Sequence, residues 1–183
     1  MEPMKLRIIG PGELPDEQYF IVRWSTLRRP LGLAIGTERL PDDDVAIHAL
    51  VEEAGTVLSV GRAHLIPEDS DGAMSDHAGE GASTCPAFTP LSGHADFPEI
   101  DELRPAFHIR QMGTIEERRR QGLAARILQG LEEASCQIWG CRSGWLQARM
   151  HAIPFYENQG WQVFGEEYMI EKVGPHLSMW KKF

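Results

Sequence analysis

The stretch that decides the fold reads Arg118-Arg119-Arg120-Gln121-Gly122-Leu123-Ala124 and lies between a predicted strand and a predicted amphipathic helix. A helix N-terminus carries partial positive charge and unpaired amides, so three arginines there are unfavourable unless an anion is bound. A phosphate or pyrophosphate would resolve this, and Gly122 and Ala124 would keep bulky side chains clear of it. Alternatively, the arginines form a solvated turn that is paired with Glu116 and Glu117. Charge alone leaves both interpretations open.

A second stretch at residues 146 to 161 reads L-Q-A-R-M-H-A-I-P-F-Y-E-N-Q-G-W. With it, the chain resembles the GNAT superfamily of N-acetyltransferases. That family has [QR]-x-x-G-x-[GA] after its fourth strand, matched here by Arg119, Gly122 and Ala124, and A-x-x-F-Y-x-x-x-G-[FYW] after its fifth. The first pattern alone is weak, but the two patterns at this distance are specific. The detailed resemblance covers residues 106 to 183, and strand order extends it to the N-terminal half.

The resemblance implies a mixed α/β fold with a central, mainly antiparallel twisted sheet. The sheet would splay between its fourth and fifth strands and be flanked by helices. It also implies an N-acetyltransferase that uses acetyl-coenzyme A as cosubstrate, bound in the gap between these strands. The acetyl group would move to a primary amine of a small molecule or peptide by direct attack in a ternary complex.

The resemblance also implies which residues bind the coenzyme. The backbone amide of Met112 would hold the thioester carbonyl, with Gly113 beside it, and Thr114 would meet the pantetheine. A donor fixed at this carbonyl stabilises the charge that develops as the amine attacks. His151 stands where the family often has asparagine, and its imidazole can still donate to a pantetheine amide. The amides that would bind the pyrophosphate belong to Arg119, Arg120, Gln121, Gly122, Leu123 and Ala124.

Tyr156 is the candidate proton donor. Collapse of the tetrahedral intermediate expels a thiolate, and a tyrosine hydroxyl can supply the proton. Without the F-Y-x-x-x-G-W context, a packed helix tyrosine would be the simpler interpretation.

His108 is the candidate base, because it lies four residues before Met112 and is expected on the same strand face. Histidine titrates in the required range. A buried histidine bonded to a backbone carbonyl is the alternative. His176 is expected near the last strand, facing the acceptor pocket, whereas His77 and His94 are expected at the surface.

Length and composition favour one intracellular domain over residues 1 to 183, because the 183-residue chain is long enough to form a core without disulfides or metals. No secretory signal or apolar run suited to a membrane helix is visible, so we expect a cytoplasmic protein with no membrane partner. Three cysteines do not form a disulfide framework or a metal motif, so no metal is expected. A homodimer is left open.

The net charge of -9 belongs to one segment. Residues 66 to 103 contain nine acidic residues and no lysine or arginine, and the rest of the chain is balanced. Nucleic acid is therefore a poor partner. The acidic segment, here residues 67 to 105, is rich in Gly, Ser, Asp and Pro and is predicted to be an insertion or mobile loop. One hypothesis is that it borders the acceptor entrance and attracts cationic amines.

The expected order of elements follows from hydrophobic periodicity. Strands are expected at 5 to 9, 45 to 52, 56 to 65, 106 to 114 and 144 to 149, followed by two closing strands. Helices are expected from about 15 to 30, from 121 to 137 and from 152 to 159.

Two functional alternatives stay open. A non-catalytic acyl-coenzyme A sensor would keep the anion site but would need neither Tyr156 nor an acceptor pocket. Transfer of a longer acyl chain would need a wider gap between the strands.

Overall fold

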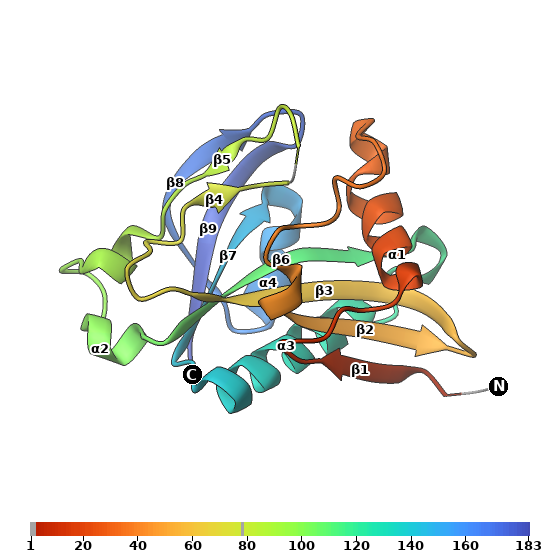
Figure 1. Ribbon diagram of the computed structural model, residues 1–183. Helices are drawn as coiled ribbons and strands as arrows, with labels where there is room; N and C mark the ends of the chain where they lie inside the picture. Colours follow the sequence, from red (N-terminus) through yellow and green to blue (C-terminus); the bar gives the residue numbers. More distant parts are fainter. Residues whose placement is uncertain (1–2, 78) are drawn as a thin grey trace.

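A seven-stranded sheet and two main helices form the frame of the computed structural model, which describes residues 3–77 and 79–183 (Figure 1). The N-terminal half supplies β1 Lys5–Ile9, α1 Glu17–Leu27, β2 Ile47–Glu53 and β3 Thr56–Ile66. The C-terminal half supplies β6 Ala106–Thr114, α3 Leu123–Trp139, β7 Ser143–Arg149, α4 Ile153–Asn158, β8 Gln162–Ile170 and β9 Gly174–Lys182. The short elements are β4 Met74–Ser75, β5 Thr84–Cys85, α2 Ile100–Leu103 and the 3-10 turns Arg29–Leu31, Asp43–Val45, Thr89–Ser92, Glu116–Arg118 and Met150–Ala152.

The strands of the large sheet follow the order β1-β2-β3-β6-β7-β9-β8. Every neighbouring pair is antiparallel except β6 and β7, which are parallel. Parallel neighbours need a crossover connection, and α3 provides it. The predicted class, mixed α/β with a mainly antiparallel sheet, is confirmed.

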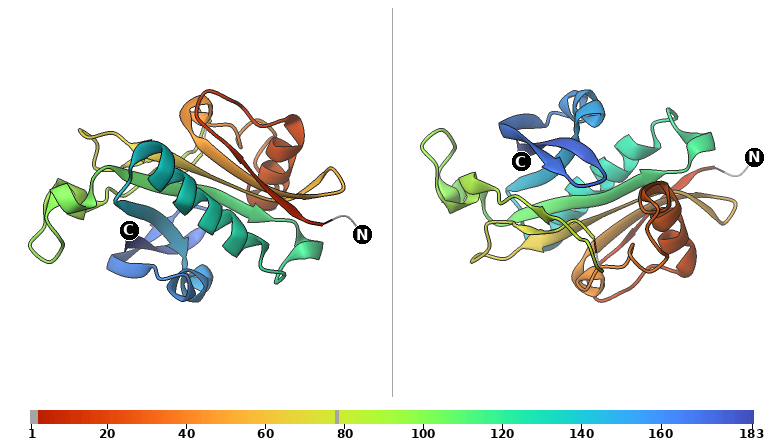
Figure 2. Two further views of the ribbon diagram at one scale, coloured as in Figure 1. Left: turned by 90° about the horizontal axis from the view of Figure 1, so that it is seen from below. Right: turned by 90° about the horizontal axis from the view of Figure 1, so that it is seen from above.

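Helices α1 and α3 cover opposite faces of the sheet (Figure 2). Successive strand residues point to opposite faces, so one strand serves both helices. In β2, Ala49 belongs to the buried cluster that contains Ile127 of α3, whereas Leu50 belongs to the cluster that contains Tyr19 of α1. These two apolar layers hold the strands between the helices.

The ends of α1 follow local chemistry. Asp16 caps its N-terminus by accepting a hydrogen bond from the amide of Tyr19 at 3.4 Å. The helix ends at Leu27, earlier than the predicted limit at Pro30, because the chain tightens there into a 3-10 turn. This places Arg28, the residue that closes α1, beside the sheet.

A β-bulge in β6 changes which residues share a face. Gln111 and Met112 both lie opposite Gly61, because the register with β3 shifts between Val60 and Arg62. The extra residue reverses the alternation. Met112 therefore packs with the α3-side cluster, whereas His108 lies against Phe88 on the other side. The expectation that His108 and Met112 share a strand face is wrong, since a bulge is not visible in strand periodicity.

Strands β6 and β7 are paired only at their beginnings. Their register covers the three pairs Ala106 with Ser143, Phe107 with Gly144 and His108 with Trp145. Beyond them, β6 continues to Thr114 and β7 to Arg149 without pairing to each other. The two strands therefore have backbone groups free on their facing edges.

The acidic segment packs beside the C-terminal strands (Figure 1). Phe88 and Leu91 are fully buried in a cluster with Trp145, and Phe164 of β8 packs against it. The segment also contains β4, β5 and α2. The prediction of a mobile loop misses these elements, because its few apolar residues are too far apart in sequence to form a periodic pattern.

Candidate active site

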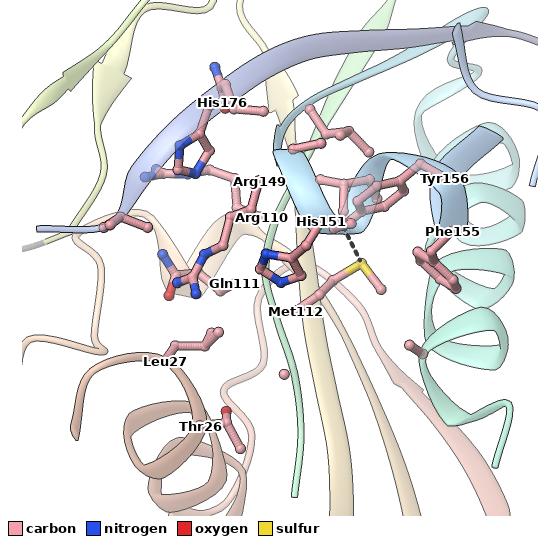
Figure 3. Close-up of a pocket in the computed structure, with 18 of the residues that line it drawn as sticks. Thr26, Leu27, Arg110, Gln111, Met112, Arg149, His151, Phe155, Tyr156 and His176 are labelled. Carbon is pink, nitrogen blue, oxygen red and sulfur yellow. Dashed lines mark hydrogen bonds between the residues drawn. The ribbon is translucent and has the colours of Figure 1, made fainter. Parts of the chain in front are cut away.

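A cavity of about 600 Å³ lies where β6 and β7 separate (Figure 3). Arg119 and Ala124 line it beside the N-terminus of α3, and Arg149 and His176 line it from β7 and β9. Figure 3 shows Met112, Phe155 and Tyr156 on one side of the cavity, with His151 between them and a polar group. That group consists of Arg110, Gln111, Arg149 and His176. The cavity thus joins a helix N-terminus to a set of polar side chains.

The N-terminus of α3 is open to a ligand. Its N-cap is Gly122, with a left-handed φ of 77°, and no side chain of the described residues caps the helix. The amides of the first turn are therefore left without a side-chain partner. A Cβ at Gly122 would meet nothing within 4 Å, so the backbone conformation, rather than lack of space, favours glycine here.

The three arginines before α3 have different partners. Arg118 forms an ion pair with Glu53 at 2.7 Å, which raises its pKa. Within the described residues, the side chain of Arg119 donates only to the carbonyl of Thr114, at 3.4 Å, and Arg120 forms no ion pair. In the described ranges, neither Glu116 nor Glu117 pairs with these arginines, so the pairing that a solvated turn would require is absent. Arg119 and Arg120 keep their charge available for an anion.

The predicted coenzyme-binding residues fall into two groups. Met112, Gly113, Thr114, Arg119, Ala124 and His151 line the cavity. Arg120, Gln121, Gly122 and Leu123 do not, although they form the turn that leads into α3. The side chain of Leu123 is buried in the core, so only its amide is available to a ligand. The hydroxyl of Thr114 lies 2.8 Å from that of Ser59, which orients it.

Gly113 is required by close packing. A Cβ at this position would lie 2.2 Å from the Oγ1 atom of Thr26 in α1. The C-terminal turn of α1 therefore rests directly on the backbone of β6, next to the bulge. This contact brings Arg28 to the edge of the cavity, which it lines.

Tyr156 is held by α4 with its hydroxyl 3.7 Å from the Sδ atom of Met112 (Figure 3). Burial raises the pKa of Tyr156 to about 12, and the charge of Arg149 opposes this increase. The phenol therefore keeps its proton at neutral pH, which is the form that a proton donor needs.

His108 does not line the cavity. Its ring is fully buried, and its Nε2 atom lies 2.7 Å from Oε1 of Gln147, which does line the cavity. Burial and the neighbouring His64 lower the pKa of His108 well below its usual range. His108 therefore reaches the cavity only through the side chain of Gln147.

His176 lines the cavity, as expected from its position near the last strand. Its Nδ1 atom lies 2.8 Å from the carbonyl oxygen of Gly174, so in the neutral ring Nδ1 donates and Nε2 carries the lone pair. Burial lowers the pKa of His176. In the pairing of β7 with β9, His176 lies directly opposite Arg149.

The sequence analysis missed most of the polar residues beside His176. Arg28, Arg110, Gln111 and Arg149 line the cavity, as do Asp76 and Cys85 of the acidic segment. The sequence signals two of these positions: Arg110 and Gln111 immediately precede Met112. Arg149 lies within the second stretch, residues 146 to 161.

The two histidines of the acidic segment differ. His77, expected at the surface, is buried, and its Nε2 atom lies 3.8 Å from a carboxylate oxygen of Asp76. His94 is exposed, as expected. Throughout the described ranges, no cluster of His, Cys, Asp and Glu is suited to a metal ion, and no helix has the length and apolarity needed to cross a bilayer.

Comparisons with known proteins agree with this geometry. A family model described as an acetyltransferase (GNAT) domain matches residues 87–183. The uncharacterized N-acetyltransferase YitI of Bacillus subtilis is 30% identical over 76 residues, which is 42% of this chain and 50% of that protein. The chain thus spans about half the length of the curated relatives it matches.

Solved structures match over nearly the whole chain. An acyl-CoA N-acyltransferase from Pseudomonas aeruginosa has a TM-score of 0.66 at 16% identity, covering 98% of this chain and 99% of that one. Arabidopsis thaliana NAA60, solved in complex with acetyl-CoA, has a TM-score of 0.62 at 13% identity, covering 99% of both chains. The fold is shared with these proteins, and from the match to more than half of its length the chain belongs to the GNAT family of acetyltransferases.

Proposed function

We propose that this protein transfers an acetyl group from acetyl-coenzyme A to a primary amine that also carries a carboxylate, as an amino acid does. The proposal rests on one observation. A single cavity runs from the N-terminus of α3, past Tyr156, to the side chains of Arg28, Arg110 and Arg149. The first part suits a pyrophosphate, the second a leaving thiolate, and the third an anionic acceptor.

The residues present fit the coenzyme. Within the described residues, the amides at the start of α3 have no side-chain cap and Arg119 and Arg120 form no ion pair, so both features suit a pyrophosphate. The facing edges of β6 and β7, unpaired beyond His108, suit the amides of pantetheine. Acetyl-coenzyme A supplies the acetyl group as an activated thioester.

Two groups in this chain would act on the thioester end. The backbone amide of Met112, at the bulge, is proposed to donate to the carbonyl oxygen as negative charge develops there. Tyr156 is proposed to give its proton to the departing sulfur, because its hydroxyl lies beside Met112 and stays protonated at neutral pH.

The amine must lose a proton before it attacks. For an ordinary amine with a pKa of about 10.4, reaching the neutral form at pH 7 costs roughly 4 to 5 kcal/mol. We propose His176, through its Nε2 atom, as the group that accepts this proton, directly or through water. His176 lines the cavity and His108 does not, so His108 is proposed to orient Gln147 instead.

Direct attack is favoured over an acyl-enzyme. Cys85 is the only cysteine that lines the cavity in the described part of the chain, and burial raises its pKa. The thiol therefore stays protonated at neutral pH, and a protonated thiol is a poor nucleophile.

The arginines that line the cavity favour an acceptor with a negative charge. Arg28, Arg110 and Arg149 line the end of the cavity near His176, and Asp76 is the one carboxylate among the described lining residues. The other eight acidic residues of the acidic segment are exposed at the surface. We propose an anionic acceptor in place of the cationic amines expected for this segment, because arginines and not these carboxylates line the cavity, although Asp76 and Cys85 do bring the segment to the same end.

None of these arginines has a carboxylate partner within the described residues. Arg28 and Arg110 donate to backbone carbonyls of Asp76 and Ser75, and Nη1 of Arg110 is buried with no partner in the described part of the chain. The guanidinium of Arg149 makes no hydrogen bond or ion pair with any described residue. Buried guanidinium groups need acceptors, and a carboxylate matches their paired donors.

The test is a screen of amines for coenzyme A release at saturating acetyl-coenzyme A. Each amino acid is compared with its own amide, which keeps the amine and removes the carboxylate charge. The proposal expects the acid to react with a kcat/KM roughly 10- to 100-fold above that of the amide, since charge-assisted hydrogen bonds are strong. Binding of acetyl-coenzyme A without turnover of any amine would favour a sensor. Equal or better turnover of amides would exclude an anionic acceptor.

A further inference from the structure

We infer that Gln111 is a positioning residue for the acceptor: its side chain fixes the guanidinium of Arg28 at the acceptor end of the cavity. The inference rests on the proposed function, because it concerns how the acceptor pocket of that site is held together. Three features support it, namely the backbone of Gln111, its hydrogen bonds and its place on the cavity wall.

The backbone of Gln111 adopts a conformation that favours glycine. Its φ of 57° is left-handed, and side chains with a Cβ are uncommon there. Glycine would fit this bulge position with less strain. A glutamine held in this conformation points to a role for its side chain.

Both polar atoms of the Gln111 side chain form hydrogen bonds. Its Oε1 atom accepts a hydrogen bond from Nη2 of Arg28 at 2.9 Å, and its Nε2 atom donates to the backbone oxygen of Asp76 at 3.2 Å. Nη2 of Arg28 also donates to the same oxygen of Asp76, at 3.0 Å. Three segments far apart in the chain, the end of α1, the bulge of β6 and the acidic segment, therefore meet at one closed set of hydrogen bonds.

The arrangement leaves the charge of Arg28 intact. Both of its acceptors are neutral, one an amide and the other a backbone carbonyl. Burial lowers the pKa of Arg28 to about 10, which still leaves it protonated at neutral pH. Gln111 and Arg28 both line the cavity, so a carboxylate that enters meets a guanidinium already held in one orientation. Without the amide of Gln111, Arg28 keeps only the carbonyl of Asp76.

Two variants of Gln111 separate positioning from stability. Gln111→Gly removes the side chain and relieves the left-handed strain, whereas Gln111→Ala removes the side chain and keeps the strain. Both variants should raise the KM for the carboxylate acceptor by roughly 10-fold, the loss expected for one oriented, charge-assisted contact. In both, kcat should stay within about 3-fold and the affinity for acetyl-coenzyme A should not change.

The melting temperatures of the two variants should differ. The Gly variant should melt above the Ala variant, because only the Ala variant keeps the left-handed strain. A merely structural role predicts instead that KM follows stability, so that the Gly variant binds the acceptor more tightly than the Ala variant does. An unchanged KM in the Gly variant, or a loss confined to the Ala variant, would overturn the inference.

A failure of the proposed function gives a different result. If none of the amines tested causes the wild type to release coenzyme A, catalysis is excluded. Calorimetry of amino acids on the coenzyme A-bound protein then decides the inference. Carboxylate binding that weakens in both Gln111 variants supports positioning by Gln111. Equal binding in wild type and variants, or no binding to the wild type, contradicts it.

Discussion

The two ends of the cavity are built in different ways. The proposed coenzyme end uses neighbouring residues: Arg119 and Ala124 line it, and Gly122 lies between them in the short stretch that leads into α3. The proposed acceptor end uses side chains from the end of α1, from β6, β7 and β9, and from the acidic segment. A motif can encode the first end, because its geometry is that of a single turn. The second end exists only after the sheet has formed.

The chemistry of the two ends also differs. The coenzyme end presents backbone amides of a helix N-terminus, which depend little on which side chains surround them. The acceptor end presents guanidinium groups and an imidazole, which depend entirely on side-chain identity and packing. Substitutions should therefore separate coenzyme binding from acceptor selection.

The largest effect is expected at the coenzyme end. Gly122→Asp should abolish detectable binding of acetyl-coenzyme A, because it adds a negative charge where the amides of α3 are proposed to meet the pyrophosphate. Gly122→Asn is the matched control, since asparagine has the same shape, tolerates a left-handed backbone and is neutral. Calorimetry on the folded variants measures both affinities. An Asp variant that binds as tightly as the Asn variant would remove the pyrophosphate site from α3.

The second largest effect is expected at Tyr156, which lies between the two ends of the cavity. Tyr156→Phe keeps the ring and removes the hydroxyl that lies beside Met112, so turnover should fall about 10- to 1000-fold. The affinity for acetyl-coenzyme A should hardly change, because the hydroxyl acts only during the reaction. Steady-state kinetics and calorimetry check the two parts. Unchanged turnover would leave Tyr156 with a packing role alone.

A smaller effect is expected for the charge of the acceptor end. Arg149→Met should lower the ratio of kcat/KM for an amino acid to that for its amide by roughly 10-fold, since one charge-assisted contact is lost. Arg149→Lys should restore part of the ratio, because it returns the charge without the paired donors. Arg119→Met, at the coenzyme end, is the control and should leave the ratio unchanged while weakening coenzyme binding. A ratio that falls equally in both Met variants would contradict the division between the two ends.

The smallest effect concerns pH. The base must be neutral to accept a proton, so the rate should fall as pH drops through the pKa of His176, which burial places below the ordinary value of 6.5. The acidic limb of the profile of kcat against pH should therefore lie below about pH 6.5. His176→Gln should remove this limb, whereas His108→Gln should leave it in place. A limb that persists without His176 would point to another base.

Most of the frame could be predicted from the sequence. The predicted strand at 106 to 114 coincides with β6, and the other main elements lie within a few residues of their predicted limits. Local periodicity and turn residues determine such elements. The short elements of the acidic segment could not be predicted, because Phe88 and Leu91 become a core only against Trp145 and Phe164.

The sequence by itself determined the family, the turn before α3 that is proposed to bind an anion, and the position of Tyr156, because each depends on residues close together in the chain. Only the tertiary structure decided which side chains line the proposed acceptor end of the cavity. A bulge at Gln111 turned Met112 away from the face of His108, and packing at Gly113 brought Arg28 to the cavity. Contacts of this kind depend on strand register and on the meeting of distant segments, and neither leaves a periodic trace in the sequence.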